Sequence, residues 1–350
     1  MKTKRNSSIE LLRIVAMLMI IAQHYVYHAD YDRSIFDTVS ANVVYLKALS
    51  MFGYSACTFF GLISGYHLIR KDTGKGFYQK LVPLILETTF YSVTIMAIAS
   101  SCGLVSLSLK DMAKQILAVF YGNWYVVFYI VLYLFAPFIN PFLKAMEKKE
   151  YRKLLFLCGV LFIALQTFLG EVYDLGNIDF MFLSYIFGAY VQLYPEDFSY
   201  KNICNLLAGL GMALLIVASL IVLDLLGLKT GNVKFIHNDT FLIRWDSLPQ
   251  FAFSLFIFLY AVKKQFHNSF IDLFGSAVLG VYLIHDGLFR NLIWNKIWPN
   301  VFYVESPYLH SILKILAVFA VCALIDILRQ LLLERPLLKA LKRTKLYERL

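Results

Sequence analysis

The chain has 350 residues, of which 59% are hydrophobic, and its mean hydropathy is +0.65. This excludes an ordinary soluble domain, in which about 45–50% of residues are apolar. The net charge of +10 would suit a nucleic-acid-binding protein, but Lys and Arg also gather in the cytoplasmic loops of membrane proteins. We therefore predict an integral membrane protein with no nucleic-acid partner.

Apolar segments near the length of about 20 residues that crosses a bilayer follow one another along the chain. No polar stretch between them is long enough for a separate soluble domain, so residues 1–350 are predicted to form one domain. The fold class is therefore all-α and polytopic, with about ten transmembrane helices. The expected spans are 9–27, 49–69, 81–102, 117–143, 153–170, 178–194, 203–227, 243–262, 270–294 and 309–333.

The distribution of positive charge predicts the topology. With the N-terminus inside, Lys and Arg are about twice as frequent in the inner loops as in the outer ones. An even number of spans then places the basic C-terminal tail inside as well. The basic N-terminal flank resembles that of a signal peptide, but Arg13 interrupts the apolar run and no cleavage site follows. We expect a retained first span, cytoplasmic termini and a location in the plasma membrane.

Two ionisable residues share the first span. Arg13 and His24 are eleven residues apart, and at about 100° per residue they fall on the same helix face, about 16 Å apart along the axis. An ionisable group inside a membrane is costly and points to a functional site. Glu10 precedes Arg13 by three residues and is expected to pair with it. The alternative is a Glu10 that merely neutralises an Arg13 reaching back to the interface.

His24 is the candidate general base, because the pKa of a histidine lies near neutrality. The alternative is an aromatic belt at the membrane surface, since His24 is followed by Tyr25, Tyr27 and His28. In the ninth span, His285 lies at a depth similar to that of His24, so both are expected to line one cavity. Asp286 adjoins His285, but neighbouring residues on a helix do not face each other, so the two are not expected to form a dyad.

The loop between the second and third spans is basic and carries Arg70, Lys71, Lys75 and Lys80. These residues either reflect the positive-inside rule or bind the phosphates of a cytoplasmic donor such as coenzyme A. Trp124, near the outer start of the fourth span, is either an interfacial anchor or a platform for a sugar. Ser64-Gly65 would allow close helix packing.

Familiar catalytic and metal-binding patterns are missing from the sequence. It contains no GxSxG elbow, no HExxH motif and no Gly-rich dinucleotide fingerprint. The five cysteines are scattered and form no CxxC pair, so neither a disulfide framework nor a metal site is predicted.

The segment SIELLRIVAMLMIIAQHY resembles the opening of acyltransferase family 3, integral membrane enzymes that modify surface polysaccharides and other glycans. The family's hallmark is an Arg separated by ten residues from a His, with an acid three residues before the Arg. Further similarities follow in the expected order: FFGLISGYHL, KLVPL, NWYVVFYIVLYLFAPF, FLSYIFGAY, GVYLIH and ERPLL. The chain departs from the family pattern at the third span, where Lys80 stands in a motif that is often richer in Arg.

This resemblance implies transfer of an acyl group, usually acetyl, from acyl-CoA to a hydroxyl of a glycan or lipid-linked sugar. It implies that His24 activates the acceptor hydroxyl or briefly carries the acyl group, that Arg13 orients the donor, and that Glu10 holds Arg13. The basic loop of Arg70, Lys71, Lys75 and Lys80 would bind acetyl-CoA, and the acceptor would contact Trp124, Tyr282 and His285.

A transport function is the alternative to acyl transfer. Intramembrane His, Arg and acidic residues suit a proton-coupled transporter or a flippase of a glycan precursor equally well. Inverted repeats would favour a carrier, but the two halves of the sequence show no convincing similarity. Binding of acyl-CoA would separate the two functions, because a carrier has no reason to bind it.

Overall fold

The computed structural model describes residues 6–30, 33–71, 74, 76–121, 123–170, 176–236, 241–244, 246–300 and 306–343. These residues form helices and no strands, which confirms the all-α fold. The main helices are α1 (Ser7–Tyr27), α2 (Ala41–Met51), α3 (Gly53–Leu68), α4 (Leu81–Ser101), α5 (Leu109–Ile116), α6 (Ala118–Tyr121), α7 (Trp124–Ala145), α8 (Lys148–Gly159), α9 (Leu165–Leu169), α10 (Asn177–Leu193), α11 (Asn202–Thr230), α12 (Val233–Ile236), α13 (Leu248–Lys263), α14 (Ser269–Ser276), α15 (Val278–His285), α16 (Pro307–Arg329) and α17 (Arg335–Leu341).

Each of the ten predicted spans corresponds to helix, but the helices differ in length. Within the described residues, seven are long and apolar enough to cross a membrane. The sixth, eighth and ninth spans are shorter helices of 16 or 17 residues: α10, α13 and the pair α14–α15. At 1.5 Å per residue they extend about 25 Å, less than the hydrocarbon core of about 30 Å. The ninth span differs most from expectation, because its helix ends at His285 instead of continuing to residue 294.

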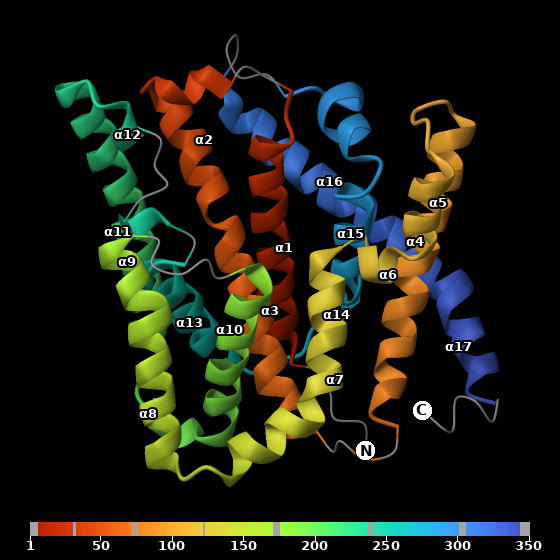
Figure 1. Ribbon diagram of the computed structural model, residues 1–350, viewed down its shortest axis with the longest axis horizontal. Helices are drawn as coiled ribbons and strands as arrows, with labels where there is room; N and C mark the ends of the chain where they lie inside the picture. The colour runs from red at the N-terminus through yellow and green to blue at the C-terminus, as the bar shows by residue number, and fades with distance from the viewer. Residues whose placement is uncertain are drawn as a thin grey trace.

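Helix α1 lies in the middle of the bundle (Figure 1) and packs against α2, α3, α13, α14, α15 and α16. Its N-terminus is tied down by polar contacts. Asn6 caps the helix by accepting a hydrogen bond from the backbone N–H of Ser8, and the Ser7 hydroxyl donates to Asp272 of α14 over 2.5 Å. The start of α1 and the end of α17 lie toward the same side of the molecule in Figure 1. This arrangement agrees with an even number of crossings.

Helices α3 and α10 cross in close contact, as the Ser64-Gly65 pair predicts. A Cβ on Gly65 would lie 2.0 Å from the backbone oxygen of Tyr185, and one on Gly188 would lie 2.0 Å from that of Leu62. Only residues without a side chain let the two backbones approach so closely. This crossing fixes α3, which forms one wall of the candidate site.

A buried ionic network joins α4 to the end of α16. Arg329 donates to Asp326 over 2.8 Å and lies 3.3 Å from Glu87, while the Tyr91 hydroxyl donates to Asp326 over 2.8 Å. Asp326 in turn packs on Gly280 of α15, where a Cβ would meet its carboxylate. The network therefore holds α4, α15 and α16 in a set arrangement around the site.

Candidate active site

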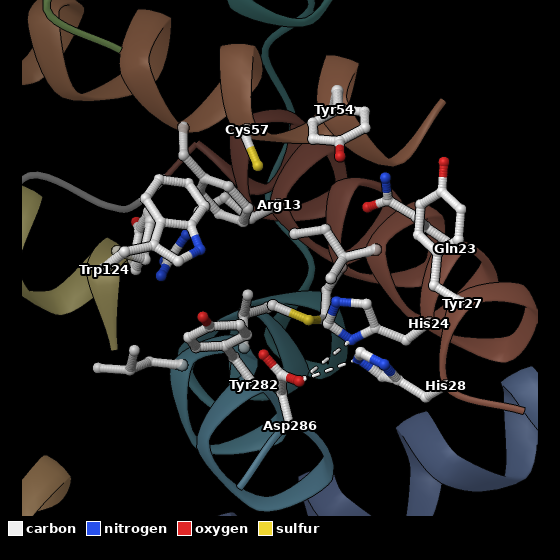
Figure 2. Close-up of a pocket in the computed structure, with 16 residues that line it drawn as sticks. Arg13, Gln23, His24, Tyr27, His28, Tyr54, Cys57, Trp124, Tyr282 and Asp286 are labelled. Atoms are coloured by element: carbon white, nitrogen blue, oxygen red, sulfur yellow. Dashed lines mark hydrogen bonds and ion pairs between the residues drawn. The ribbon is translucent and has the colours of Figure 1, made fainter. Parts of the chain in front are cut away.

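Arg13 and His24 line one cavity of about 210 Å³ between α1, α3, α7 and α15, which we call the central cavity (Figure 2). Their shared helix face agrees with the eleven-residue spacing. Trp124 and Tyr282, which the sequence proposed as contacts for the acceptor, also line this cavity. A cationic group, an imidazole and two aromatic rings therefore face the same space.

Glu10 pairs with Arg13 as the sequence predicts. The Arg13 guanidinium donates to the Glu10 carboxylate over 2.8 Å. Glu10 packs against Gly275 of α14, where a Cβ would lie 2.5 Å from its carboxylate oxygen. The neighbouring helix therefore holds Glu10 in place, and Glu10 holds Arg13. This geometry places Arg13 inside the bundle, which argues against a side chain that merely reaches back to the membrane surface.

A second cavity, of about 460 Å³, lies on the other side of Arg13. We call it the Lys71 cavity, and its polar wall is formed by Glu10, Arg13, Ser64, His67, Lys71 and Glu87. Arg13, Phe60, Tyr125 and Leu279 line both this cavity and the central one. The two spaces therefore adjoin at Arg13.

The basic loop contributes to the Lys71 cavity through one residue. Burial lowers the pKa of the Lys71 ammonium from its usual value of 10.5, and the charge of nearby Lys80 lowers it further. Arg70 instead donates to the backbone oxygen of Gln192 over 2.7 Å, and neither Arg70 nor Lys80 lines the cavities described here. Lys75 lies outside the described residues. Of the candidate donor-binding residues, Lys71 is therefore the one that faces a cavity.

The hydrogen bonds around His285 determine which nitrogen of His24 is free. His285 Nδ1 lies 2.6 Å from the backbone oxygen of Val281, and His285 Nε2 lies 3.0 Å from His24 Nδ1. Because a carbonyl oxygen only accepts, the proton of a neutral His285 is on Nδ1, and its Nε2 must accept. His24 Nδ1 therefore donates, and His24 Nε2 keeps its lone pair. A ring nitrogen with a free lone pair is what a general base requires.

His285 itself is fully buried behind His24 and is not part of the cavity wall. The expectation that both histidines line one cavity therefore holds only for His24. The cause is the bond from His285 to Val281, one turn back in α15, which turns its ring toward α1. His285 contacts His24 but does not itself reach the central cavity.

Asp286 follows the last residue of α15 and faces His24 of α1 and His28, which directly follows α1 (Figure 2). Its carboxylate accepts from His28 Nε2 over 3.1 Å and lies 3.9 Å from His24 Nδ1. Neither His28 nor Asp286 is among the site residues predicted from the sequence. The four-residue spacing from His24 to His28 was the available signal, because it places both on one helix face. The end of α15 at His285 frees Asp286 to turn toward α1, and the Asp286-Gly287 pair, a common turn sequence, was the signal for it.

Asp286 also lines a third cavity, of about 160 Å³, between α4, α5, α6 and the segment after α15. We call it the Arg290 cavity. Its wall is mostly polar and includes Ser92, Gln115, Asn123 and Arg290. The Thr88 hydroxyl in this wall is buried and has no hydrogen-bond partner among the described residues. The central cavity thus lies between the other two: Arg13 lines both it and the Lys71 cavity, and Asp286 lines both it and the Arg290 cavity.

Comparison with known proteins identifies one family. A family model described as an acyltransferase domain matches residues 6–327 of the chain. No curated protein and no solved structure matches it. The matched range begins just before α1 and ends within α16, so it contains every helix that lines the three cavities.

Proposed function

This chain belongs to the acyltransferase family whose model covers residues 6–327, and we propose that it moves an acetyl group from acetyl-CoA to a hydroxyl of a cell-surface or lipid-linked glycan. Its family and its apolar helices make it a multi-pass membrane acyltransferase. Acetyl-CoA as the donor, a glycan as the acceptor, a location in the plasma membrane and cytoplasmic termini are the proposed parts of this function. The observation that carries it is the free Nε2 of His24 in a central cavity that adjoins the Lys71 cavity on one side and the polar Arg290 cavity on the other.

The donor is proposed to enter through the Lys71 cavity. Lys71 and Arg13 both face this space, and the ammonium group of Lys71 is a common ligand for phosphate. The narrow acyl-bearing arm of the donor would then pass Arg13 and reach the central cavity. Because the guanidinium of Arg13 lines both cavities, it is placed to orient the thioester, and Glu10 keeps it in position.

The acceptor is proposed to approach from the Arg290 cavity. Hydroxyl and amide groups such as those of Ser92, Gln115 and Asn123 are suitable partners for the hydroxyls of a neutral sugar. The buried Thr88 hydroxyl offers a further hydrogen bond. In the central cavity, the rings of Trp124 and Tyr282 provide flat apolar faces on which a sugar can stack.

In the proposed reaction, His24 Nε2 removes the proton of the acceptor hydroxyl as its oxygen attacks the thioester carbon. The new C–O bond forms, the C–S bond breaks, and the departing thiolate takes the proton back from His24. His285 Nε2 holds His24 Nδ1–H throughout, so that the ring keeps its orientation. Such a base contributes about 10²–10⁴-fold to the rate, and positioning of the two substrates must supply much of the rest.

Two experiments test this function. First, the purified protein should bind coenzyme A in detergent, as measured by calorimetry, and a Lys71→Glu variant should bind it less tightly. A transporter of glycan precursors has no reason to bind coenzyme A. Second, NMR of surface glycans should show O-acetyl groups in cells with the gene and their loss in cells without it. Absence of coenzyme A binding together with unchanged glycan acetylation would contradict the proposal.

A further inference from the structure

One cluster in the central cavity is not used fully by the proposed reaction. His24, His28 and Asp286 each offer one ligand atom, and these atoms all lie within 4.8 Å of one another. His24 lies in the last turn of α1 and His28 directly follows that helix, while the carboxylate directly follows α15. Figure 2 shows the three side chains converging on the same part of the cavity wall.

The donor atoms match those preferred by transition metals. Two imidazoles and one carboxylate form the ligand set of catalytic zinc sites and of several iron sites. Zinc ligands lie about 2.0–2.2 Å from the metal, so in a tetrahedral site they are roughly 3.4 Å apart. His28 Nε2 and Asp286 Oδ1 are already 3.1 Å apart, and His24 Nδ1 lies 3.9 Å from the same oxygen. Small rotations of these side chains would therefore complete three corners of a tetrahedron.

The surroundings favour a reversible site over a permanent one. The three side chains retain 13–19% of their exposure, so an ion can reach them from the cavity. The charge of Arg290, 3.9 Å from Asp286, opposes binding of a cation. A metal would also displace the proton that His24 Nδ1 shares with His285. These opposing effects make the site weaker than a structural zinc site.

We propose that His24, His28 and Asp286 form a binding site for a divalent transition metal such as Zn²⁺, and that metal at this site reversibly blocks acyl transfer. A metal on His24 Nδ1 leaves the proton of the neutral ring on Nε2, so that the base of the reaction loses its free lone pair. The blocking effect rests on the proposed function, whereas metal binding does not.

Metal binding is tested by titration of the full-length protein with Co²⁺, after purification in detergent with a tag that contains no histidine. Co²⁺ bound by nitrogen and oxygen ligands absorbs in the visible range, and Zn²⁺ should displace it. We expect one Co²⁺ per chain. His28→Gln and Asp286→Asn should each weaken binding about tenfold or more, since each removes one of three ligands.

His267→Gln is the matched control. His267 lies near the start of α14, pairs with Asp272 and lines none of the three cavities. It should bind Co²⁺ like the wild type. If the wild type shows no visible band, or if the two ligand variants bind as tightly as the control, the site does not exist. The wild-type titration decides this even where a variant fails to fold.

Blocking is tested in an acyl-transfer assay with the same proteins. Zn²⁺ should lower the rate of the wild type and of His267→Gln about tenfold or more, and EDTA should restore it. The blocking effect is wrong if Zn²⁺ leaves the rate unchanged at concentrations that displace Co²⁺. It is also wrong if EDTA abolishes the rate, because the metal would then be required for activity. A protein that binds Co²⁺ but transfers no acyl group would instead contradict the proposed function.

Discussion

His24 Nδ1 lies 3.0 Å from His285 Nε2, and this bond sets the ring of the proposed base. His285→Leu removes the acceptor, whereas His285→Gln can keep one through its amide oxygen. We expect kcat to fall roughly 10- to 100-fold in the Leu variant, which is part of the 10²–10⁴-fold that a positioned base contributes, and less in the Gln variant. Steady-state kinetics at saturating acetyl-CoA measures this. Wild-type kcat in His285→Leu would show that His24 needs no such partner.

Glu10 is placed to act on the reacting atoms through Arg13, because it accepts from Arg13 over 2.8 Å and lies outside the central cavity. The effects of Glu10→Ala and Arg13→Ala on kcat/KM should therefore be far from additive. We expect each single variant to lose activity and the double variant to be about as active as Arg13→Ala alone. A complete cycle of four proteins measures this. Additive losses would give Glu10 a role of its own.

The affinity for coenzyme A should depend on pH through Lys71. Because burial lowers the pKa of Lys71, its ammonium loses its proton at a lower pH than an exposed lysine does. Phosphate affinity is present while Lys71 is charged and declines as the pH rises toward that lowered pKa. A charged hydrogen bond is worth about 1.5 kcal/mol, which corresponds to roughly tenfold in Kd.

Calorimetric titration with coenzyme A at neutral and at alkaline pH measures this change. The control is Lys71→Arg, since a guanidinium stays charged over the whole range. An equal decline in affinity in both proteins would assign the pH dependence to another group.

The crossing of α3 and α10 should tolerate no added methyl group. Gly65→Ala or Gly188→Ala would force the two backbones apart, because each Cβ would lie 2.0 Å from a backbone oxygen. Overpacking of this kind costs about 1–3 kcal/mol. Gly211→Ala in α11 is the control, since a Cβ there meets nothing within 4 Å. Thermal unfolding in detergent compares the three variants. Equal midpoints in all three would mean that the crossing is not close.

Much of the fold could be predicted from apolar length alone, because every long apolar run must become a helix in a bilayer. The residues at which the short helices end could not be predicted from apolar length. α15 ends at His285, where the chain turns and brings Asp286 toward α1. The Asp286-Gly287 pair is a common turn sequence, but apolar residues resume after it, so apolar length alone carries the predicted span past this turn. The structure therefore ends the predicted ninth span nine residues early, before the mixed polar and apolar stretch 286–294.

The candidate site was predictable where it lies on one helix. Glu10, Arg13 and His24 are all on α1, and helical spacing relates them directly. The positions of residues from different helices depend on packing that the spacing does not contain. His285 therefore lies behind His24 instead of beside it, and Arg70 turns to α10 while Lys71 faces the cavity.

The central claim is that His24 performs acyl transfer, and the most direct measurement is transfer of label from radiolabelled acetyl-CoA to glycan by purified protein. We expect His24→Ala to fold normally and to lose activity by about 10²–10⁴-fold, while His267→Gln retains the wild-type rate. A His24→Ala variant that transfers acetyl groups at the wild-type rate would contradict the account.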